Sequence, residues 1–138
     1  MSTEREISYG GVVVRGDDVI VIVPRGRRRV LGLPKGGPAA GESPEQTAAR
    51  EVREETGVTA SVRDRLGQVD YSYRRGGRWI DKTVHFFLCD YEAGDTADHD
   101  HEVDDARWMP LEEARRRLSY PGERRMIEQA LSVLAANG

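Results

Sequence analysis

The chain has 138 residues, which suits one domain with a full-sized hydrophobic core. Charged residues make up 33% and hydrophobic residues 38%, so the composition excludes a chain that is disordered throughout. The net charge of -3 argues against an extended nucleic-acid surface, and a single cysteine excludes an intramolecular disulfide. Because no apolar run is long enough for a membrane span or a secretion signal, we expect a cytoplasmic protein without a membrane partner or a stable nucleic-acid partner.

Two apolar, β-branched segments open the chain. Residues 7–14 and 19–23 are predicted strands, and Asp17 and Asp18 between them indicate a turn, so the pair is typical of a hairpin. A basic loop over Arg25–Arg29 follows. We expect Val30 and Leu31 to form a short strand before the glycine-containing loop at residues 33–37.

The clearest element is a helix over Ser43–Thr56. Ser43 suits the N-cap, Pro44 suits the first turn, and Gln46 completes a capping box. Gly57 lies where a C-terminal cap is needed. Local sequence therefore predicts both ends of this helix.

The remainder of the chain is predicted to be first strand-rich and then helical. Residues 58–73 are mainly strand, residues 74–77 a turn, and residues 79–91 a strand with alternating faces. One face carries Val84, Phe86 and Leu88, and the other carries His85, Phe87 and Cys89, the last expected to be an inert core thiol. Residues 92–105 are expected to be an acidic loop, and residues 111–118 and 123–136 to be helices separated by Pro121 and Gly122. This order predicts one α/β (α+β) domain over residues 1–138, with a mixed sheet between helices.

Three carboxylates lie on one face of the predicted helix. Glu51, Glu54 and Glu55 are three and four residues apart, so they fall within an arc of roughly 100°. They repel one another, and the single guanidinium of Arg50 does not neutralise all three. A hard divalent cation such as Mg²⁺ does, while it keeps positions for water and phosphate oxygens. The opposite, packing face carries small side chains, namely Ala49, Val52 and Thr56.

The loop before the helix fits the same chemistry. Gly36 allows backbone groups to come close to a metal or a phosphate. Lys35 supplies a positive charge of the kind that a phosphate needs.

The segment from Gly36 to Val58 resembles the signature of Nudix hydrolases at every defining position. It contains Gly36, five residues, Glu42, seven residues and then Arg50-Glu51-Val52-Arg53-Glu54-Glu55-Thr56-Gly57-Val58. Outside it, the runs at residues 33–36 and 82–87 and the Glu102–Trp108 spacing are similar to the dinucleoside polyphosphate hydrolase branch and its MutT-like neighbours. Leu31 departs from that branch, which often has an aromatic residue there. The resemblance implies a Nudix-type α/β/α sandwich.

The resemblance also implies a role for each matching residue. Glu51, Glu54 and Glu55 would bind Mg²⁺, with Mn²⁺ as a substitute and the Gly36 carbonyl as a further ligand. Glu42 and Arg50 would be a structural pair that holds the loop on the helix. Water would attack one phosphorus of a nucleoside diphosphate linked to a variable group, and a carboxylate would take the proton. The catalytic candidates are Glu51, Glu54 and Glu102.

Glu102 lies in the acidic stretch, which is either a solvated loop or the source of a base or an extra ligand. We choose Glu102 over Asp104 and Asp105. His99 and His101 are interpreted as surface residues.

The candidates for substrate binding lie mostly outside the signature. Tyr71 and Tyr73 are two residues apart on a strand, so they share a face that either packs on the sheet or stacks a purine base. Lys82 and His85 are either ordinary strand residues or phosphate contacts. The remaining basic candidates, either solvated or bound to a polyphosphate tail, are Arg25, Arg27 and Lys35.

We expect a small nucleotide polyphosphate as the partner and either a monomer or a homodimer as the assembly. Four functions remain possible. The first is hydrolysis of dinucleoside polyphosphates such as diadenosine tetraphosphate. The second is a MutT-like pyrophosphatase of ordinary or oxidised nucleoside triphosphates, and the third is a diphosphoinositol polyphosphate phosphohydrolase. The fourth is a nucleotide sensor without catalysis, against which the intact set of glutamates argues.

Overall fold

The structure, a computed structural model, describes residues 3–137. The strands form one mixed sheet in the order β4-β5-β1-β2-β6, with the two-residue β3 beside β1. β1 and β5 are parallel, and the other neighbours are antiparallel. The strand bounds are β1 (Glu4–Arg15), β2 (Asp18–Pro24), β3 (Lys35–Gly36), β4 (Val58–Arg75), β5 (Arg78–Gly94) and β6 (Val103–Pro110).

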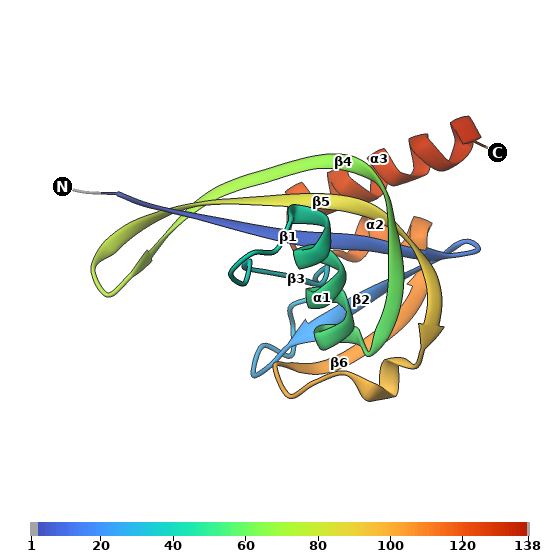
Figure 1. Ribbon diagram of the computed structural model, residues 1–138, viewed down its shortest axis with the longest axis horizontal. Helices are drawn as coiled ribbons and strands as arrows, with labels where there is room; N and C mark the ends of the chain where they lie inside the picture. The colour runs from blue at the N-terminus through green and yellow to red at the C-terminus, as the bar shows by residue number, and fades with distance from the viewer. Residues whose placement is uncertain (1–2, 138) are drawn as a thin grey trace.

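Helices cover both faces of the sheet (Figure 1). α1 (Pro44–Thr56) lies on one face, and α2 (Leu111–Arg117) and α3 (Pro121–Asn137) lie on the other. Neighbouring strand residues alternate between the two cores: Phe86 packs in the core under α2 and α3, and Phe87 packs in the core under α1. Because both faces are buried, the central strands have nearly continuous apolar runs. The predicted sandwich and the predicted alternation of residues 84–89 are confirmed.

The opening hairpin is paired only next to its turn. Val14 is opposite Val19 and Arg15 is opposite Asp18; β1 then runs beside β5, while β2 runs beside β6. The loop carrying β3 enters between the diverging strands, where Tyr9 is opposite Gly36. Gly10 permits this approach, since a Cβ there would lie 2.5 Å from the Pro34 carbonyl oxygen. The divergence therefore places Gly36 at the centre of the sheet.

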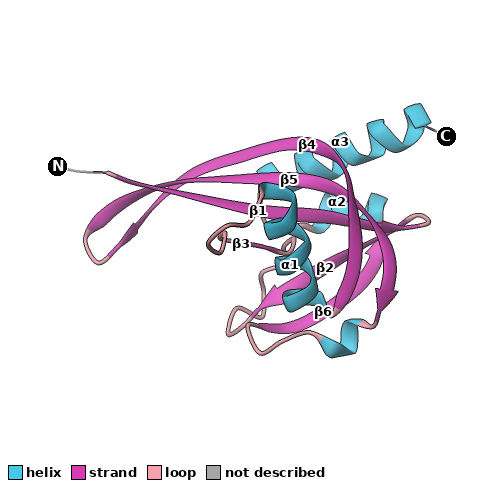
Figure 2. Cartoon of the chain, viewed as in Figure 1, coloured by secondary structure: helices cyan, strands magenta, loops and turns pink. Residues whose placement is uncertain are grey.

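β4 and β5 extend beyond the body of the protein as a long arm (Figure 2). Its turn uses Gly76 and Gly77, whose φ angles of 59° and 77° are left-handed. Across the arm, Tyr71 is opposite Lys82 and Tyr73 is opposite Ile80. The predicted strand, turn and strand at residues 58–91 are thus confirmed, with longer strands than expected.

Four details of the predicted elements were wrong. The expected acidic loop at residues 92–105 contains a 3₁₀ turn, η1 (Thr96–Asp98), and its last residues belong to β6. β6 pairs with β2, a pairing that the apolar alternation of the sequence did not reveal. α3 begins at Pro121, because proline needs no hydrogen bond in a first turn. In place of a strand at Val30 and Leu31, the structure has one bridge between Ile22 and Gly32. On α1, Ala48 rather than Ala49 is the alanine that is fully buried.

Among the helices within residues 3–137, none combines the length and the apolar character needed to cross a lipid bilayer.

Candidate active site

The ends of α1 are fixed by the caps that its sequence predicts. The Ser43 hydroxyl accepts the Gln46 N–H at 3.1 Å, and the Gln46 side chain accepts the Ser43 N–H at 2.9 Å. Gly57 ends the helix with a left-handed φ of 77° and donates its N–H to the Arg53 carbonyl. This rigid helix presents Glu51, Glu54 and Glu55, which together with Gly36 we name the carboxylate edge.

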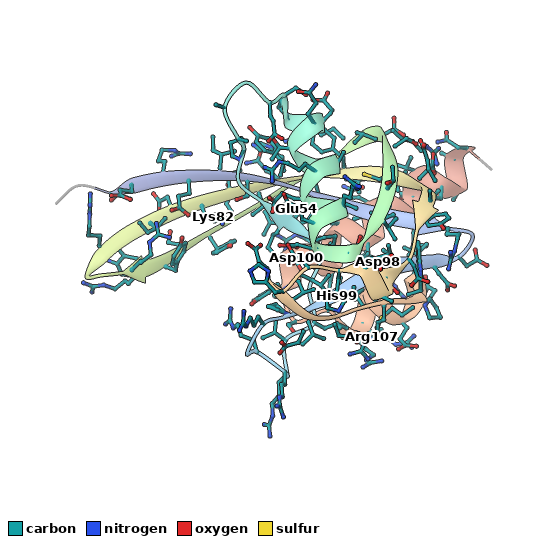
Figure 3. The ribbon with its side chains drawn as sticks, turned by 60° about the horizontal axis from the view of Figure 1, so that its bottom comes forward. Glu54, Lys82, Asp98, His99, Asp100 and Arg107 are labelled. Carbon is teal, nitrogen blue, oxygen red and sulfur yellow. The ribbon has the colours of Figure 1, made fainter. Side chains whose placement is uncertain are left out.

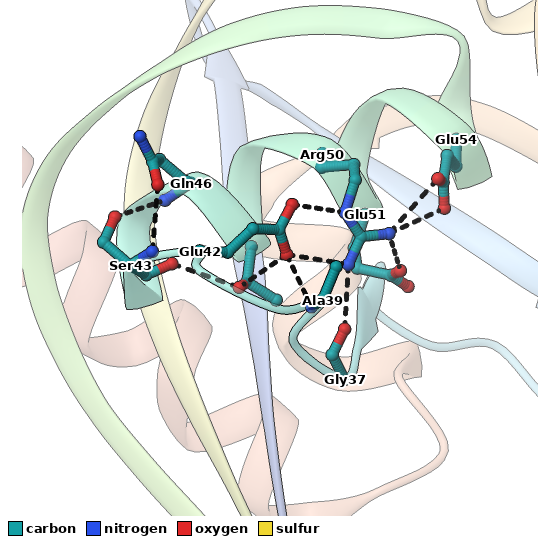
Figure 4. Close-up of polar contacts among 9 residues, drawn as sticks. Gly37, Ala39, Glu42, Ser43, Gln46, Arg50, Glu51 and Glu54 are labelled. Carbon is teal, nitrogen blue, oxygen red and sulfur yellow. Dashed lines mark hydrogen bonds and ion pairs between the residues drawn. The ribbon is translucent and has the colours of Figure 1, made fainter.

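Arg50 lies among the acidic side chains and the loop (Figure 4). Its Nη1 donates to Glu51 at 2.6 Å and to Glu54 at 3.1 Å. Its Nε donates to Glu42 at 2.6 Å, and its Nη2 donates to the Gly37 carbonyl at 2.9 Å. One guanidinium therefore joins the loop to the helix and also places a positive charge between two carboxylates.

Gly36 packs directly against Glu51. A Cβ on Gly36 would lie 1.6 Å from Glu51 Oε2, so only glycine leaves room for that carboxylate. The Lys35 N–H donates to Glu55 Oε1 at 3.0 Å, which holds the third carboxylate on the same loop. The backbone of residues 35 and 36 thus lies against two members of the carboxylate edge.

Burial makes two of these carboxylates poor anions. Burial raises the pKa of Glu55 to about 8, and the nearby negative charges of Glu51 and Glu102 act in the same direction. Burial also raises the pKa of Glu51, although Arg50 opposes the rise. The hydrogen bonds from Arg50 and Ala39 instead lower the pKa of Glu42 to about 2. A further cation beside the edge would therefore stabilise the charged forms of Glu51 and Glu55.

The donor set fits a hard divalent cation. Carboxylate and carbonyl oxygens suit Mg²⁺, which keeps several waters and needs few protein ligands. Within residues 3–137, no group of three acidic, histidine or cysteine side chains lies close enough together, as placed, to hold a metal ion. The Arg50 guanidinium shows that a positive charge is accommodated between Glu51 and Glu54.

A cavity of about 840 Å³ opens beside the carboxylate edge. Gly36, Glu55 and Glu102 are among its lining residues. The other walls come from the β4–β5 arm, the start of α3 and the loop after β2. We name its aromatic side the aromatic wall, formed by Tyr71, Tyr73 and Tyr120. This volume is within the usual range for small-molecule sites.

Glu102 is the member of the acidic stretch that lines the cavity. Asp104 instead accepts the Gly26 N–H at 3.0 Å, and Asp105 pairs with Arg107 at 2.9 Å. Their placement agrees with the choice of Glu102 over both as a catalytic candidate.

Residues 4–130 match the profile of the NUDIX domain family. The chain belongs to the Nudix family. The MutT4 protein of Mycobacterium tuberculosis is 42% identical over 139 residues, which cover 94% of this chain and 56% of that protein. An 8-oxo-(d)GTP phosphatase of Mycolicibacterium smegmatis is 36% identical over 110 residues, which cover 80% of this chain and 33% of the phosphatase. The Nudix chain thus spans about half or less of the length of these relatives.

Solved Nudix structures share the fold. A NUDIX hydrolase from Nitrosomonas europaea superposes with a TM-score of 0.78 at 23% identity, over 94% of this chain and 90% of that chain. A C. elegans Ap4A hydrolase gives a TM-score of 0.76 at 22% identity, over 95% of this chain and 98% of that chain. The predicted resemblance to Nudix hydrolases is confirmed by these matches, and divalent metal ions are general cofactors of this family.

The Nudix cavity brings together most of the proposed substrate contacts. Arg27, Tyr71, Tyr73 and Lys82 line it, although they come from three separate segments. The Tyr71 and Tyr73 ring centroids are 6.1 Å apart, and Tyr71 is 43% exposed, so its ring is open to a ligand. Lys82 lies on the arm in Figure 3, and burial lowers its pKa.

Two predicted substrate contacts lie elsewhere. His85 is on the α1 side of the sheet, stacked on Tyr9 at 5.5 Å between ring centroids and 2.9 Å from an Arg65 nitrogen. It points away from the cavity because side chains on β5 alternate, with Val84 and Phe86 facing the cavity. The Arg25 side chain is exposed and outside the cavity lining. Neither residue is placed for the phosphate contact that we expected.

Lys35 lines the cavity but already has an acidic partner. Its Nζ lies 2.9 Å from Glu123 Oε2 and donates to the Leu33 carbonyl at 3.2 Å. Burial opposes its charge, but Glu123 and Glu55 raise its pKa overall. The positive charge that the sequence predicts at Lys35 is therefore largely compensated by Glu123.

The sequence did not predict the contribution of α3. Tyr120, Glu123 and Arg125 line the cavity because the start of α3 packs on β4, where Gly122 lies against Val69. The buried Glu123 was detectable only as an acid in a helix's first turn, a common feature that does not indicate a site. Leu31, where the related branch often has an aromatic residue, is buried in the core under α2 and α3 and does not line the cavity.

Proposed function

We propose that this Nudix chain is a divalent-metal-dependent pyrophosphohydrolase of purine nucleoside polyphosphates. One observation carries the proposal: a single cavity joins the carboxylate edge, at Gly36 and Glu55, to the aromatic wall. A nucleotide has a polyanionic part and an aromatic part, which match the carboxylate edge and the aromatic wall that line this cavity.

The chain's own residues divide the work of hydrolysis. Glu51, Glu54, Glu55 and the Gly36 carbonyl would hold Mg²⁺, which supplies neutralisation of phosphate charge and acidification of water when bound. Arg50 keeps the loop on the helix through Glu42 and the Gly37 carbonyl.

The cavity supplies the base and the substrate contacts. Glu102 takes the proton from the attacking water, since it lines the cavity beside Gly36 and Glu55. Lys82 and Arg27 bind phosphate oxygens, and the tyrosines stack the base.

An oxidised purine nucleoside triphosphate of the 8-oxo-(d)GTP type is our first candidate substrate. A relative named as a phosphatase of this substrate is 36% identical over 80% of the chain. The reaction would consume one water and give an 8-oxo-nucleoside monophosphate and pyrophosphate.

A dinucleoside polyphosphate is the second candidate. The sequence motifs at residues 33–36 and 82–87 favour it. The cavity also has Arg27 and Arg125 in addition to Lys82, which suits a longer phosphate chain.

Product analysis over a nucleotide panel with Mg²⁺ tests the proposal. Pyrophosphate from 8-oxo-dGTP, at a higher kcat/KM than from dGTP, supports the first candidate. ATP plus AMP from diadenosine tetraphosphate supports the second. Turnover of a diphosphoinositol polyphosphate without turnover of any nucleotide would contradict the proposal, as would no turnover in the whole panel.

A further inference from the structure

The segment from Asp100 to Asp104 is tied to the site at both ends. The Asp100 N–H donates to the carbonyl of Glu54 at 2.8 Å, which joins the segment to the last turn of α1. At the other end, the Gly26 N–H donates to Asp104 Oδ2 at 3.0 Å. The segment thus connects the helix of the carboxylate edge to the loop that carries Arg27.

The preceding turn is packed on the end of α1. A Cβ on Gly57 would lie 2.4 Å from the Asp95 carbonyl oxygen and 2.8 Å from the Asp98 carbonyl carbon. Figure 3 shows Asp98, His99 and Asp100 close to the helix end that carries Glu54. The position of Asp100 relative to Glu54 is therefore fixed by packing as well as by a hydrogen bond.

The Asp100 side chain holds the backbone of Glu102. The Glu102 N–H donates to Asp100 Oδ1 at 2.9 Å, and the Glu102 carbonyl accepts the Arg25 N–H at 3.2 Å. Among residues 3–137, the Asp100 carboxylate has no other hydrogen-bond or ion-pair partner. Asp100 is also absent from the cavity lining, so its contact with the site runs through Glu102.

From this chain of contacts we infer that Asp100 is a positioning residue: its carboxylate fixes the backbone of Glu102 so that the Glu102 side chain faces the carboxylate edge. The inference rests on the proposed function, in which Glu102 takes the proton from water. An exposed glutamate samples many rotamers. Because Asp100 is bonded to Glu54 and holds the Glu102 backbone, it restricts the positions that the Glu102 carboxylate can reach. Misplacement of a catalytic group by about 1 Å lowers the rate by up to about a hundredfold.

Amide hydrogen exchange of metal-free protein tests the contact without any catalysis. In Asp100→Ala the Glu102 amide should exchange roughly tenfold faster, because its acceptor is gone. Asp100→Asn keeps an acceptor oxygen and should keep the wild-type exchange rate. Asp105→Ala is the matched control: it removes an acid of the same stretch whose partner is Arg107. Faster exchange of the Glu102 amide in Asp100→Asn than in the wild type would overturn the inference. This measurement decides the question even if the Asp100→Ala variant does not fold.

Kinetics in two backgrounds tests the role. Asp100→Ala should lower kcat about tenfold with KM nearly unchanged, whereas Asp100→Asn and Asp105→Ala should retain wild-type kcat. In a Glu102→Gln background, Asp100→Ala should have no further effect, because it acts through Glu102. An equal loss in both backgrounds, or wild-type kcat for Asp100→Ala, would overturn the inference. Failure of the proposed function gives a different result, since all variants would then lack nucleotide turnover while the exchange result stands.

Discussion

The carboxylate edge and the aromatic wall face the same cavity but are built in different ways. The edge comes from one continuous segment, a capped helix and the loop before it, and Arg50 joins its acidic side chains by direct contacts. The wall combines a strand of the β4–β5 arm with the start of α3, two segments about fifty residues apart in the sequence. Its tyrosines are open, with Tyr71 43% and Tyr120 37% exposed.

This difference suggests that the edge and the wall have separate roles, one in the catalytic step and the other in the choice of substrate. In the proposed function the groups of the edge act on the reacting phosphate, so substitutions there should change kcat. In the same proposal the groups of the wall contact the remote part of the nucleotide, so substitutions there should change KM and the ranking of substrates.

The largest effect is expected for Glu54→Gln. Glu54 is the most exposed glutamate of the edge, at 44% of its side chain, so its loss should leave the fold intact. Turnover should fall at least about a hundredfold, since a neutral amide is a poor ligand for Mg²⁺. Steady-state kinetics and a thermal melt check both statements, with the exposed Glu45→Gln on the same helix as a control. Near wild-type turnover would contradict the proposed role of Glu54 as a metal ligand.

Gly36→Ala should have the next largest effect. The new Cβ would lie 1.6 Å from Glu51 Oε2, so that carboxylate must move. We expect kcat to fall about tenfold to a hundredfold while the melting temperature changes little, because a flexible side chain yields before the backbone does. Gly37→Ala is the matched control, since a Cβ there meets no atom of residues 3–137 within 4 Å. Equal activity of the two variants would contradict the packing of Gly36 on Glu51.

The sequence predicted the edge well because its information is local. The helix caps, the spacing of Glu51, Glu54 and Glu55, and the Glu42–Arg50 pair all lie within one segment and follow from helix geometry. The sheet order is different, since the parallel pairing of β1 with β5 joins residues 76 positions apart, such as Glu4 and Ile80. Strand alternation showed which residues share a face, but it did not show which faces meet.

The wall shows the limit of such reasoning. Tyr71 and Tyr73 were recognised as a pair on one face, but Tyr120 and Arg125 reach the cavity only because α3 packs on β4. His85 was a reasonable phosphate contact by residue type, and its place on the α1 side follows from strand alternation. The type of Lys35 predicts a positive charge for phosphate, but its partner Glu123, 88 residues away, is not visible in the local sequence. Residue type alone therefore predicts a candidate but not its partners.

Tyr71→Ala tests the wall. Stacking of a base is worth about 1–3 kcal/mol, so KM for a nucleotide should rise about tenfold with a smaller change in kcat. KM for inorganic tripolyphosphate should stay within about twofold, since it has no base. Trp79→Ala is the control, because it removes an aromatic ring of the arm that does not line the cavity. Equal increases for both substrates would reject stacking and favour a phosphate-only site.

The smallest expected effect concerns Cys89, which lies in the core under α1 and belongs to neither region. Its side chain is fully buried, and burial raises the pKa of the thiol to about 12. Because the thiolate is the reactive form, iodoacetamide at pH 8 should leave the folded protein unmodified and its activity unchanged. Unfolding in guanidinium should return the pKa to its ordinary value and allow complete alkylation, which mass spectrometry measures. Rapid labelling of the folded chain would show that the core under α1 opens, and α1 would then not be the rigid support that the carboxylate edge requires.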